Sequence, residues 1–304
     1  MKGMVFAGCS FTWGQGLWFY SDLENMYYPD TPFKFDVSKV KDPELKYKDT
    51  VRFSKLVADH FETFDVQKSG NGGSEDTSFS FIDQLFIGGS RSDITTERME
   101  YNDVDYIILQ TSQIYRNRFE FELDGETEFA VVWTSGNGHN MEKFTKWCEI
   151  NNMSFDEWLK LHLKTQTERI SQRFKEFEEL GIKTLILCWE NDYLPYIKSD
   201  PFLNERFVRL NHEGEEFDSI MKLMDKHRHM EIRKDFASFT NPPLDGHPSK
   251  ECHKVIANSI ISFIESNHEV KKRTLPLETP EVDERNAQTG ELLKNEYKNK
   301  NNLI

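Results

Sequence analysis

The chain of 304 residues carries 38 Lys and Arg against 52 Asp and Glu, which gives a formal net charge of −14. This balance argues against a protein that covers duplex nucleic acid with a broad basic face, because phosphate neutralisation needs clustered cations. A hydrophobic content of 37% with 24 Phe is too apolar and too aromatic for a disordered chain. We therefore expect a soluble globular protein that binds no nucleic acid.

We expect neither a membrane span nor a signal peptide. The first apolar run, Met4-Val5-Phe6-Ala7, is shorter than a signal-peptide core, and no run approaches the roughly 20 residues that cross a bilayer. The four cysteines are scattered without a Cys-x-x-Cys pair, so neither a disulfide framework nor a cysteine zinc site is indicated. These features together predict a cytoplasmic protein.

Short apolar runs alternate with longer amphipathic stretches, which is the pattern of a parallel α/β sheet with strands buried on both faces. The expected strands, in chain order, are residues 4–7, 64–66, 104–110, 182–189 and 207–210. The expected helices are residues 51–61, 78–87, 154–180 and a last helix around 255–264. This order predicts one doubly wound α/β domain over residues 1–266, with about five parallel strands.

Two local signals stand out between the third and fourth strands. Asp124-Gly125 separates two β-prone runs within residues 119–133, which predicts a β-hairpin inserted into the sheet domain. Ser154-Phe155-Asp156-Glu157 is a capping box, and it predicts the start of the long helix that closes at Gly181.

The chain changes character from about Asn267 onward. Residues 267–304 contain Pro276, Pro280 and many charges but few large apolar side chains. This composition predicts an extended or disordered C-terminal tail, or an arm that binds a protein partner.

The first motif, Gly8-Cys9-Ser10-Phe11-Thr12-Trp13-Gly14, follows the first strand directly. Ligands of a parallel α/β sheet bind at the carboxyl ends of its strands, so the Ser10 hydroxyl is expected to face a substrate crevice. The alternatives are an ordinary turn in which Ser10 caps a helix, or a loop that holds a phosphate on its backbone amides.

The second motif, Ser69-Gly70-Asn71-Gly72-Gly73-Ser74, follows the second strand and is therefore expected at the same edge of the sheet. Three glycines in four positions allow backbone N–H groups to converge on one oxyanion. A flexible loop, or a helix that starts at Ser74, explains the same residues without any chemistry.

The third motif, Asp245-Gly246-His247-Pro248-Ser249, precedes the last helix. A carboxylate beside an imidazole orients the ring and stabilises its protonated form, which suits His247 to take a proton from a serine hydroxyl. The alternative is that Asp245 shapes a turn and His247 is a surface histidine.

The order and spacing of the three motifs resemble the SGNH hydrolases, the GDSL-type esterases and lipases, over roughly residues 1 to 265. The resemblance implies a flavodoxin-like sheet, with Ser10 as the nucleophile and Gly72 in the oxyanion hole. It implies that His247 and Asp245 complete a catalytic triad.

The chain departs from the family pattern at three places. Cys9 replaces a loop-shaping Asp, and Asp245 lies two residues before His247, where the family usually has three. The third block, normally Gly-x-Asn-Asp, is replaced by Gln110-Thr111-Ser112-Gln113, so Ser112 is the best match for the missing oxyanion donor. Asn191, in Asn191-Asp192 after the fourth strand, is a weaker alternative donor.

Candidate substrate-binding residues lie near the motifs. Trp13 belongs to an aromatic group that suits an apolar acyl or sugar cleft, and Asn71 adjoins Gly72. Arg116 can bind a carboxylate or phosphate through two hydrogen bonds, although it and Arg118 are equally explained as solvated charges. His253 could share a metal with Asp245, but we expect no metal and no cofactor.

By this resemblance the chain is a serine hydrolase that cleaves a carboxylic ester, such as an O-acyl (acetyl) group on a carbohydrate or a small lipid-like ester. Two other interpretations stay open. One is a non-catalytic binding or assembly module of the same fold, with a degenerate oxyanion hole. The other is a phosphate or nucleotide binder that uses the loop around Gly72.

Overall fold

The computed structural model describes residues 2–9, 12, 14, 17, 42–67, 74–87, 99–112, 118–132, 138–228 and 247–267. The chain forms two compact units. Unit 1 comprises residue 1 with residues 10–67 and 208–304, and unit 2 comprises residues 2–9 and 68–207. The expected domain range, residues 1–266, stays a prediction, and nearly all of the expected tail lies outside the described residues.

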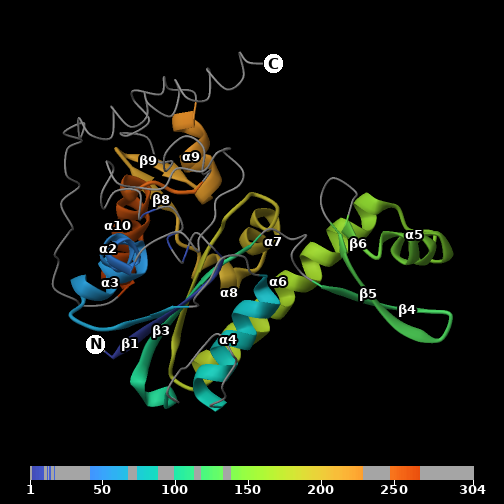
Figure 1. Cartoon of the computed structure of the whole chain (residues 1–304), viewed down its shortest axis with the longest axis horizontal. Coiled ribbons are helices and arrows are strands. Elements are labelled where there is room, and N and C mark those ends of the chain that lie inside the picture. Colours follow the sequence, from blue (N-terminus) through green and yellow to red (C-terminus); the bar gives the residue numbers. More distant parts are fainter. Residues whose placement is uncertain are drawn as a thin grey trace. The chain divides into compact units, whose positions relative to one another are not determined.

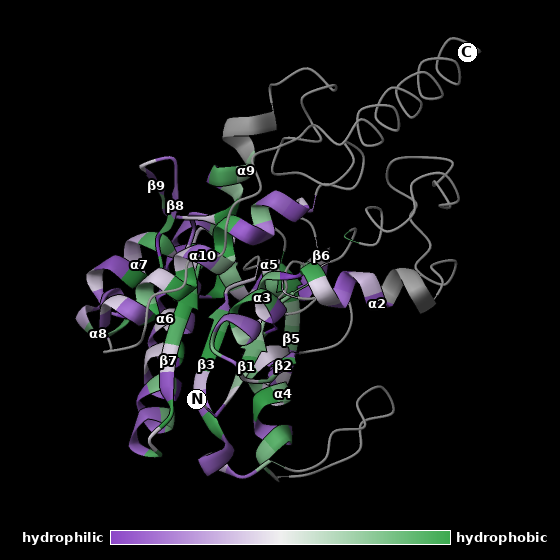
Figure 2. Ribbon diagram, turned by 90° about the vertical axis from the view of Figure 1, so that its left-hand side faces the viewer, coloured by the Kyte–Doolittle hydropathy of each residue, from purple (hydrophilic) through white to green (hydrophobic). Residues whose placement is uncertain are grey.

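The main sheet has four strands: β1 (Gly3–Ala7), β2 (Asp65–Gln67), β3 (Val104–Gln110) and β7 (Lys183–Leu187) (Figure 1). Their order is β2-β1-β3-β7, and β3 pairs in parallel with both β1 and β7. Hydrophobic residues run along β3 and β7 (Figure 2), as strands covered on both faces require. The sequence prediction of a mixed α/β fold with a parallel sheet flanked by helices is confirmed.

The fifth expected strand, residues 207–210, does not form. Phe207 makes a single parallel bridge to Ile186, and the chain then enters a separate antiparallel ribbon of β8 (Leu210–His212) and β9 (Glu215–Phe217). Glu213 and Gly214 connect the two strands with positive φ at both positions. Such a turn pairs adjacent segments with each other, which explains why this segment adds no full strand to the parallel sheet.

In unit 2, helices α4 (Glu75–Ile87) and α6 (Phe155–Glu179) begin at residues that satisfy the first free backbone groups. The Ser154 hydroxyl accepts from the Glu157 amide, and the Glu157 carboxylate accepts from the Ser154 amide (2.8 Å), so the predicted capping box is confirmed. Helix α4 starts three residues earlier than expected, because Ser74 and Thr77 exchange hydrogen bonds at its start.

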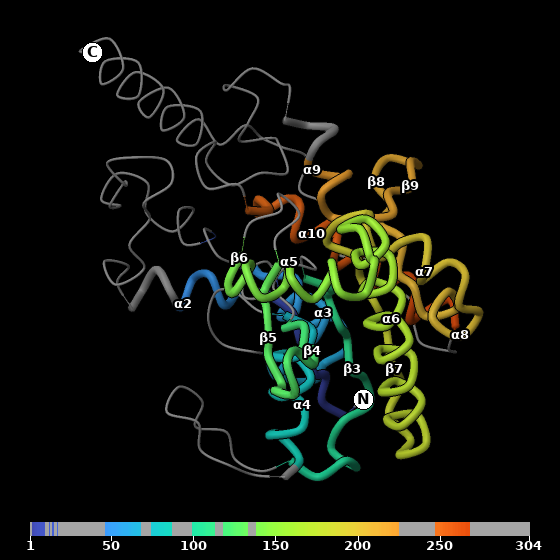
Figure 3. The backbone as a smooth tube through the Cα atoms, turned by 90° about the vertical axis from the view of Figure 1, so that its right-hand side faces the viewer, coloured from blue at the N-terminus to red at the C-terminus, as the bar shows by residue number. Residues whose placement is uncertain are grey.

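The predicted hairpin consists of β4 (Phe119–Leu123) and β5 (Glu126–Val132), joined by Asp124 and Gly125 with positive φ. Strand β6 (Gly138–His139) extends it, and helix α5 (Met141–Ile150) covers it next to the start of α6 (Figure 3). Their shared core is largely aromatic, with Phe121, Phe144 and Trp158 buried together. Unit 2 also contains a 3-10 helix (Tyr101–Asp103), α7 (Leu194–Ser199) and α8 (Pro201–Asn204).

In unit 1, the expected helix at residues 51–61 is divided. Helix α2 (Asp42–Val51) ends before Arg52, whose backbone is extended, and α3 (Phe53–His60) follows. Helix α10 (Lys250–Asn267) packs against α3 through its predicted inner face, on which every apolar residue is buried: Val255, Ile256, Ile260, Ile261 and Ile264. Helix α9 (Ile220–Arg228) follows the β8–β9 ribbon.

No helix in the described part of the chain combines the length and the apolar character that a bilayer span requires.

Candidate functional site

The carboxyl ends of β1, β3 and β7 carry a connected polar network in unit 2. The Gln110 side-chain amide donates from Nε2 to Cys9 Sγ (3.3 Å) and to the Thr111 backbone carbonyl (2.8 Å). The Thr111 amide donates to the Leu187 carbonyl (2.8 Å), and its hydroxyl accepts from the Trp189 amide (3.2 Å). In an open α/β sheet this edge binds ligands, and the point between β1 and β3, where the strand order reverses, is the favoured position.

Ser112, the predicted oxyanion donor, lies at this edge and is buried. Its backbone N–H donates to Glu75 Oε1 (2.5 Å), the first residue of α4, which is itself 1% exposed. A carboxylate is favoured at a helix start because the helix dipole is positive there. The Ser112 amide is therefore already engaged, and an ionised Glu75 would repel an oxyanion beside it.

Six of the predicted site residues fall in segments outside the described residues: Ser10, Trp13, Asn71, Gly72, Arg116 and Asp245. Their assigned roles stay predictions. The structure does describe His247 and Ser112, together with Cys9, Thr12 and Gly14 of the first motif.

His247 lies directly before α10 and is half-buried. Two residues later, Ser249 caps the helix, since its hydroxyl accepts from the Cys252 amide (3.2 Å) and its carbonyl accepts from the His253 amide (3.0 Å). Pro248 lies between His247 and this cap and is buried, which anchors the segment that carries the predicted catalytic base.

His253 is fully buried between α10 and α3. Its Nδ1 accepts from the Phe53 amide (3.2 Å), and the two rings stack with 5.6 Å between centroids. Burial, together with the positive charges of His247, Arg52 and Lys48, lowers the pKa of His253 to about 3. The ring is therefore neutral at physiological pH, with its proton on Nε2.

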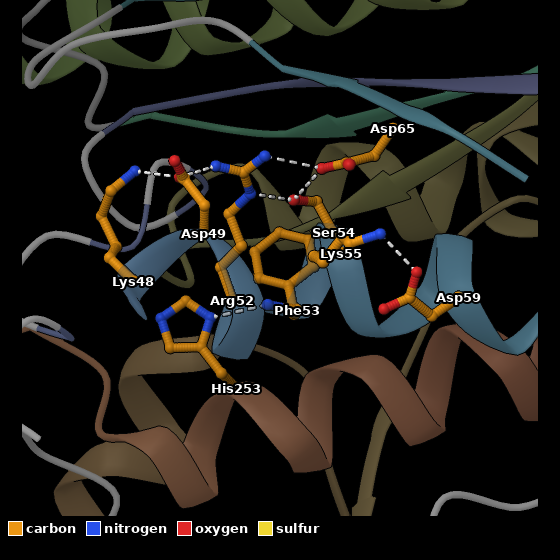
Figure 4. A network of polar contacts seen from close by, with 9 residues as sticks. All are labelled: Lys48, Asp49, Arg52, Phe53, Ser54, Lys55, Asp59, Asp65 and His253. Atoms are coloured by element: carbon orange, nitrogen blue, oxygen red, sulfur yellow. Dashed lines mark hydrogen bonds and ion pairs between the residues drawn. The ribbon is translucent and has the colours of Figure 1, made fainter. Parts of the chain in front are cut away.

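Arg52, at the break between α2 and α3, is the centre of an ion-pair network (Figure 4). It donates to Asp65 Oδ2 (3.0 Å) and to the Ser54 hydroxyl (3.0 Å), and it also contacts Asp49. The Lys48 ammonium donates to Asp49 as well (2.6 Å). Burial nevertheless lowers the pKa of Lys48, so its carboxylate partners do not fully compensate the lost hydration.

Gly14, the last residue of the first motif, lies against this network. Its φ is +79°, and a Cβ there would lie 3.2 Å from Arg52 Cβ and 3.4 Å from Lys48 Cγ. The same α2–α3 junction holds His253 through Phe53. Within unit 1, Gly14 of the first motif and His253, four residues after the third motif, thus both lie at one junction.

Sequence reasoning did not identify Lys48 and Arg52 as functional candidates. Two cations four residues apart in the sequence normally lie in solvent, and no motif marks them as buried. The one sequence signal for this junction is His253, for which the sequence suggests only a role as a metal ligand. Within the described part of the chain, no group of three or more His, Cys, Asp or Glu side chains is arranged to hold a metal ion.

The alternative residues have ordinary surroundings. Asn191 is exposed, and burial together with Glu190 raises the pKa of Asp192 beside it. Arg118 pairs with Glu120 (3.1 Å) and covers the Phe129 ring (4.1 Å to the centroid), which fits a charge on the hairpin surface. All four cysteines are buried and unbridged.

Comparison of this chain with protein-family models, curated proteins and solved structures finds no match. The motifs and the geometry within each unit are therefore the features of this chain that bear on its function.

Proposed function

We propose that the chain is a serine hydrolase that cleaves a carboxylic ester, with an O-acyl group on a carbohydrate or a small lipid-like ester as the substrate class. One observation carries the proposal: Gly14, from the motif of Ser10, lies against Lys48 and Arg52, whose charges also act on His253. His253 lies in the first turn of the helix that His247 precedes. This arrangement supports a meeting of the two motifs within unit 1.

In the proposed mechanism, His247 takes the proton of the Ser10 hydroxyl as Oγ attacks the ester carbonyl, and Asp245 stabilises the resulting imidazolium. The backbone amides of Ser10 and Gly72 donate to the tetrahedral oxyanion, assisted by the Ser112 hydroxyl. The protonated His247 then gives its proton to the leaving alcohol. Water releases the acyl group by the reverse proton path, and the mechanism uses no cofactor.

A serine-reactive fluorophosphonate probe tests this proposal on the full chain. We expect the wild type to be labelled, Ser10→Ala to lose all labelling, and His247→Gln to be labelled at least about 100-fold more slowly, because the general base is lost. Ser266→Ala, at the exposed end of α10, is the matched control and should be labelled like the wild type. Circular dichroism establishes that each variant is folded. Equal labelling of folded wild type and Ser10→Ala would contradict the proposal.

The contact between Glu75 and Ser112 favours a second candidate, a non-catalytic binding or assembly module of the same fold. A buried carboxylate beside the third block opposes the charge that ester hydrolysis develops. This candidate predicts a folded wild type that the probe does not label. It further predicts that Glu75→Gln, which removes the negative charge and retains the acceptor oxygen, does not create labelling.

A further inference from the structure

The buried side chain of His253 in unit 1 presents a hydrogen-bond donor for which no described residue serves as acceptor. Nδ1 accepts from the Phe53 amide, so the proton of the neutral ring is on Nε2. Nε2 is buried and has no hydrogen-bond partner among the described residues. An unpaired buried donor of this kind is rare in native proteins, because it loses its hydration without a replacement.

The charged groups that act on this ring are cations, of which Lys48 and Arg52 are also paired with Asp49 and Asp65. Figure 4 shows Nδ1 of the ring turned toward the Phe53 amide and Nε2 on the opposite side of the ring, with the Lys48 ammonium turned toward Asp49. The charges that act on His253 are those of His247, Arg52 and Lys48, and no carboxylate is among them. His253 also belongs to the first turn of α10, where the helix dipole is positive. A buried N–H donor in a positive field suits a negatively charged acceptor.

Gly14, the last residue of the first motif, lies close to the side chains of Lys48 and Arg52. Gly14 has no side chain, and any Cβ at this position would come within 2.8 Å of Leu17 Cδ1 and 3.2 Å of Arg52 Cβ. Gly14, four residues after the predicted nucleophile, therefore lies close to the stems of Lys48 and Arg52. A group bound at His253 would lie in the part of unit 1 that also holds Lys48, Arg52 and Gly14.

We propose that the buried Nε2–H of His253 marks a subsite for an oxyanion, a carboxylate or phosphate group carried by the substrate. That this anion is part of the substrate rests on the proposed ester hydrolysis. That an anion binds at His253 does not depend on the esterase activity. The substrate class is then an ester whose acyl or alcohol part is anionic, and His253 is a binding residue of that class.

Binding is tested first on the full wild-type chain, by following the His253 side-chain nitrogens in NMR titrations with acetate and with inorganic phosphate. We expect a saturable shift of the Nε2–H resonance, with little change for the Nδ1 acceptor. The anion that binds more tightly identifies the group as carboxylate or phosphate. Absence of a saturable shift with both anions would overturn the proposal.

His253→Asn is the informative variant, because the Asn oxygen can accept from the Phe53 amide while the Nε2 donor is lost. We expect its affinity for the preferred anion to fall about tenfold, as the loss of one hydrogen bond to a charged group implies. Lys48→Met keeps the buried stem, removes the charge and should also weaken binding. His162→Asn, at a buried histidine of unit 2, is the control and should bind like the wild type. Equal affinity in His253→Asn and wild type would contradict the assignment.

Steady-state kinetics with an anionic and a neutral ester distinguish anion binding at His253 from ester hydrolysis itself. We expect kcat/KM to be about tenfold higher for mono-p-nitrophenyl succinate than for neutral p-nitrophenyl acetate, and His253→Asn to lose this preference. An equal preference in wild type and variant would overturn the substrate assignment. Anion binding that depends on His253, in a protein that fluorophosphonate does not label, would keep the oxyanion site and reject only the esterase.

Discussion

The two units each bury a histidine on the inner face of a helix, but the surroundings differ in the sign of charge. His253 in unit 1 has a pKa of about 3, and its charged neighbours are all positive. His162 in unit 2 has a pKa of about 4, lowered by burial and raised slightly by the negative Asp76. Its ring stacks on Trp158 (5.1 Å between centroids) within an aromatic core.

The difference shows that burial alone does not indicate a site. Nε2 of His162, like that of His253, has no hydrogen-bond partner among the described residues. An anion would gain nothing from the carboxylate near His162, whereas it would neutralise the field around His253. We therefore interpret His162 as part of the core and His253 as part of a binding site.

The largest expected effect is a loss of folding stability when Arg52, one of the cations near His253, is replaced. Arg52→Met should destabilise the protein by about 3 kcal/mol, because Asp65 is only 8% exposed and would lose its charged partner, keeping only the Ser54 hydroxyl. Arg206→Met in unit 2 is the matched control. Its partner Glu178 is more exposed and keeps Thr184, so we expect about 1 kcal/mol. Urea unfolding measures both, and equal losses would remove the distinction between the units.

The second effect is a loss of stability in acid. Both histidines have a pKa below the unfolded value of 6.5, so the unfolded chain binds protons that the folded chain refuses. Their contribution is complete above pH 6.5 and is lost as the pH falls toward about 4 for His162 and about 3 for His253. Each should lose about 2 kcal/mol by pH 5, from 1.36 kcal/mol per pH unit.

This acid loss is measured by urea unfolding at pH 7 and pH 5. His253→Asn and His162→Asn should each lose about 2 kcal/mol less than the wild type between these two values. At pH 7 the anion that binds more tightly in the NMR titrations should stabilise the wild type and His162→Asn more than His253→Asn, because the affinity of His253→Asn for it is about tenfold lower. An unchanged pH dependence in either variant would show that its histidine is not buried neutral.

The smallest effect compares two glycines in the left-handed region. Gly14→Ala in unit 1 places a Cβ 2.8 Å from Leu17 Cδ1, whereas Gly181→Ala in unit 2 meets nothing within 4 Å. Both substitutions carry a backbone cost of about 1 kcal/mol, and Gly14→Ala adds steric strain of roughly another 1 kcal/mol. Thermal unfolding should place Gly14→Ala below Gly181→Ala, and the reverse order would contradict the close approach at Arg52.

The local elements of the fold were predictable because their signals lie within a few residues. The capping box at Ser154, the Asp124-Gly125 turn and the apolar face of α10 each depend on spacings of one to four residues. The segment at 207–210 misled the prediction because a short apolar run does not reveal its pairing partner. Glu213 and Gly214 pair it with β9 instead.

The candidate site was only partly predictable. Its motifs were visible as Gly, Ser, Asp and His at the ends of expected strands, and His247 lies before α10 as expected. Glu75 was not anticipated as the partner of Ser112, because 37 residues separate them and neither motif contains both. Lys48 and Arg52 carry no local sign of burial.

Helix starts, turns and buried faces follow from the order of the amino acids, since neighbouring residues supply both the hydrogen bonds and the apolar periodicity. The electrostatic field around His253 does not follow from the order of the amino acids. The ring contacts the Phe53 amide across 200 residues of chain, and the charges of Lys48 and Arg52 act on it only because α10 packs on α3. Only the packed structure, by removing water from these groups together, turns two ordinary cations and a helix histidine into a place where a negative charge is favoured.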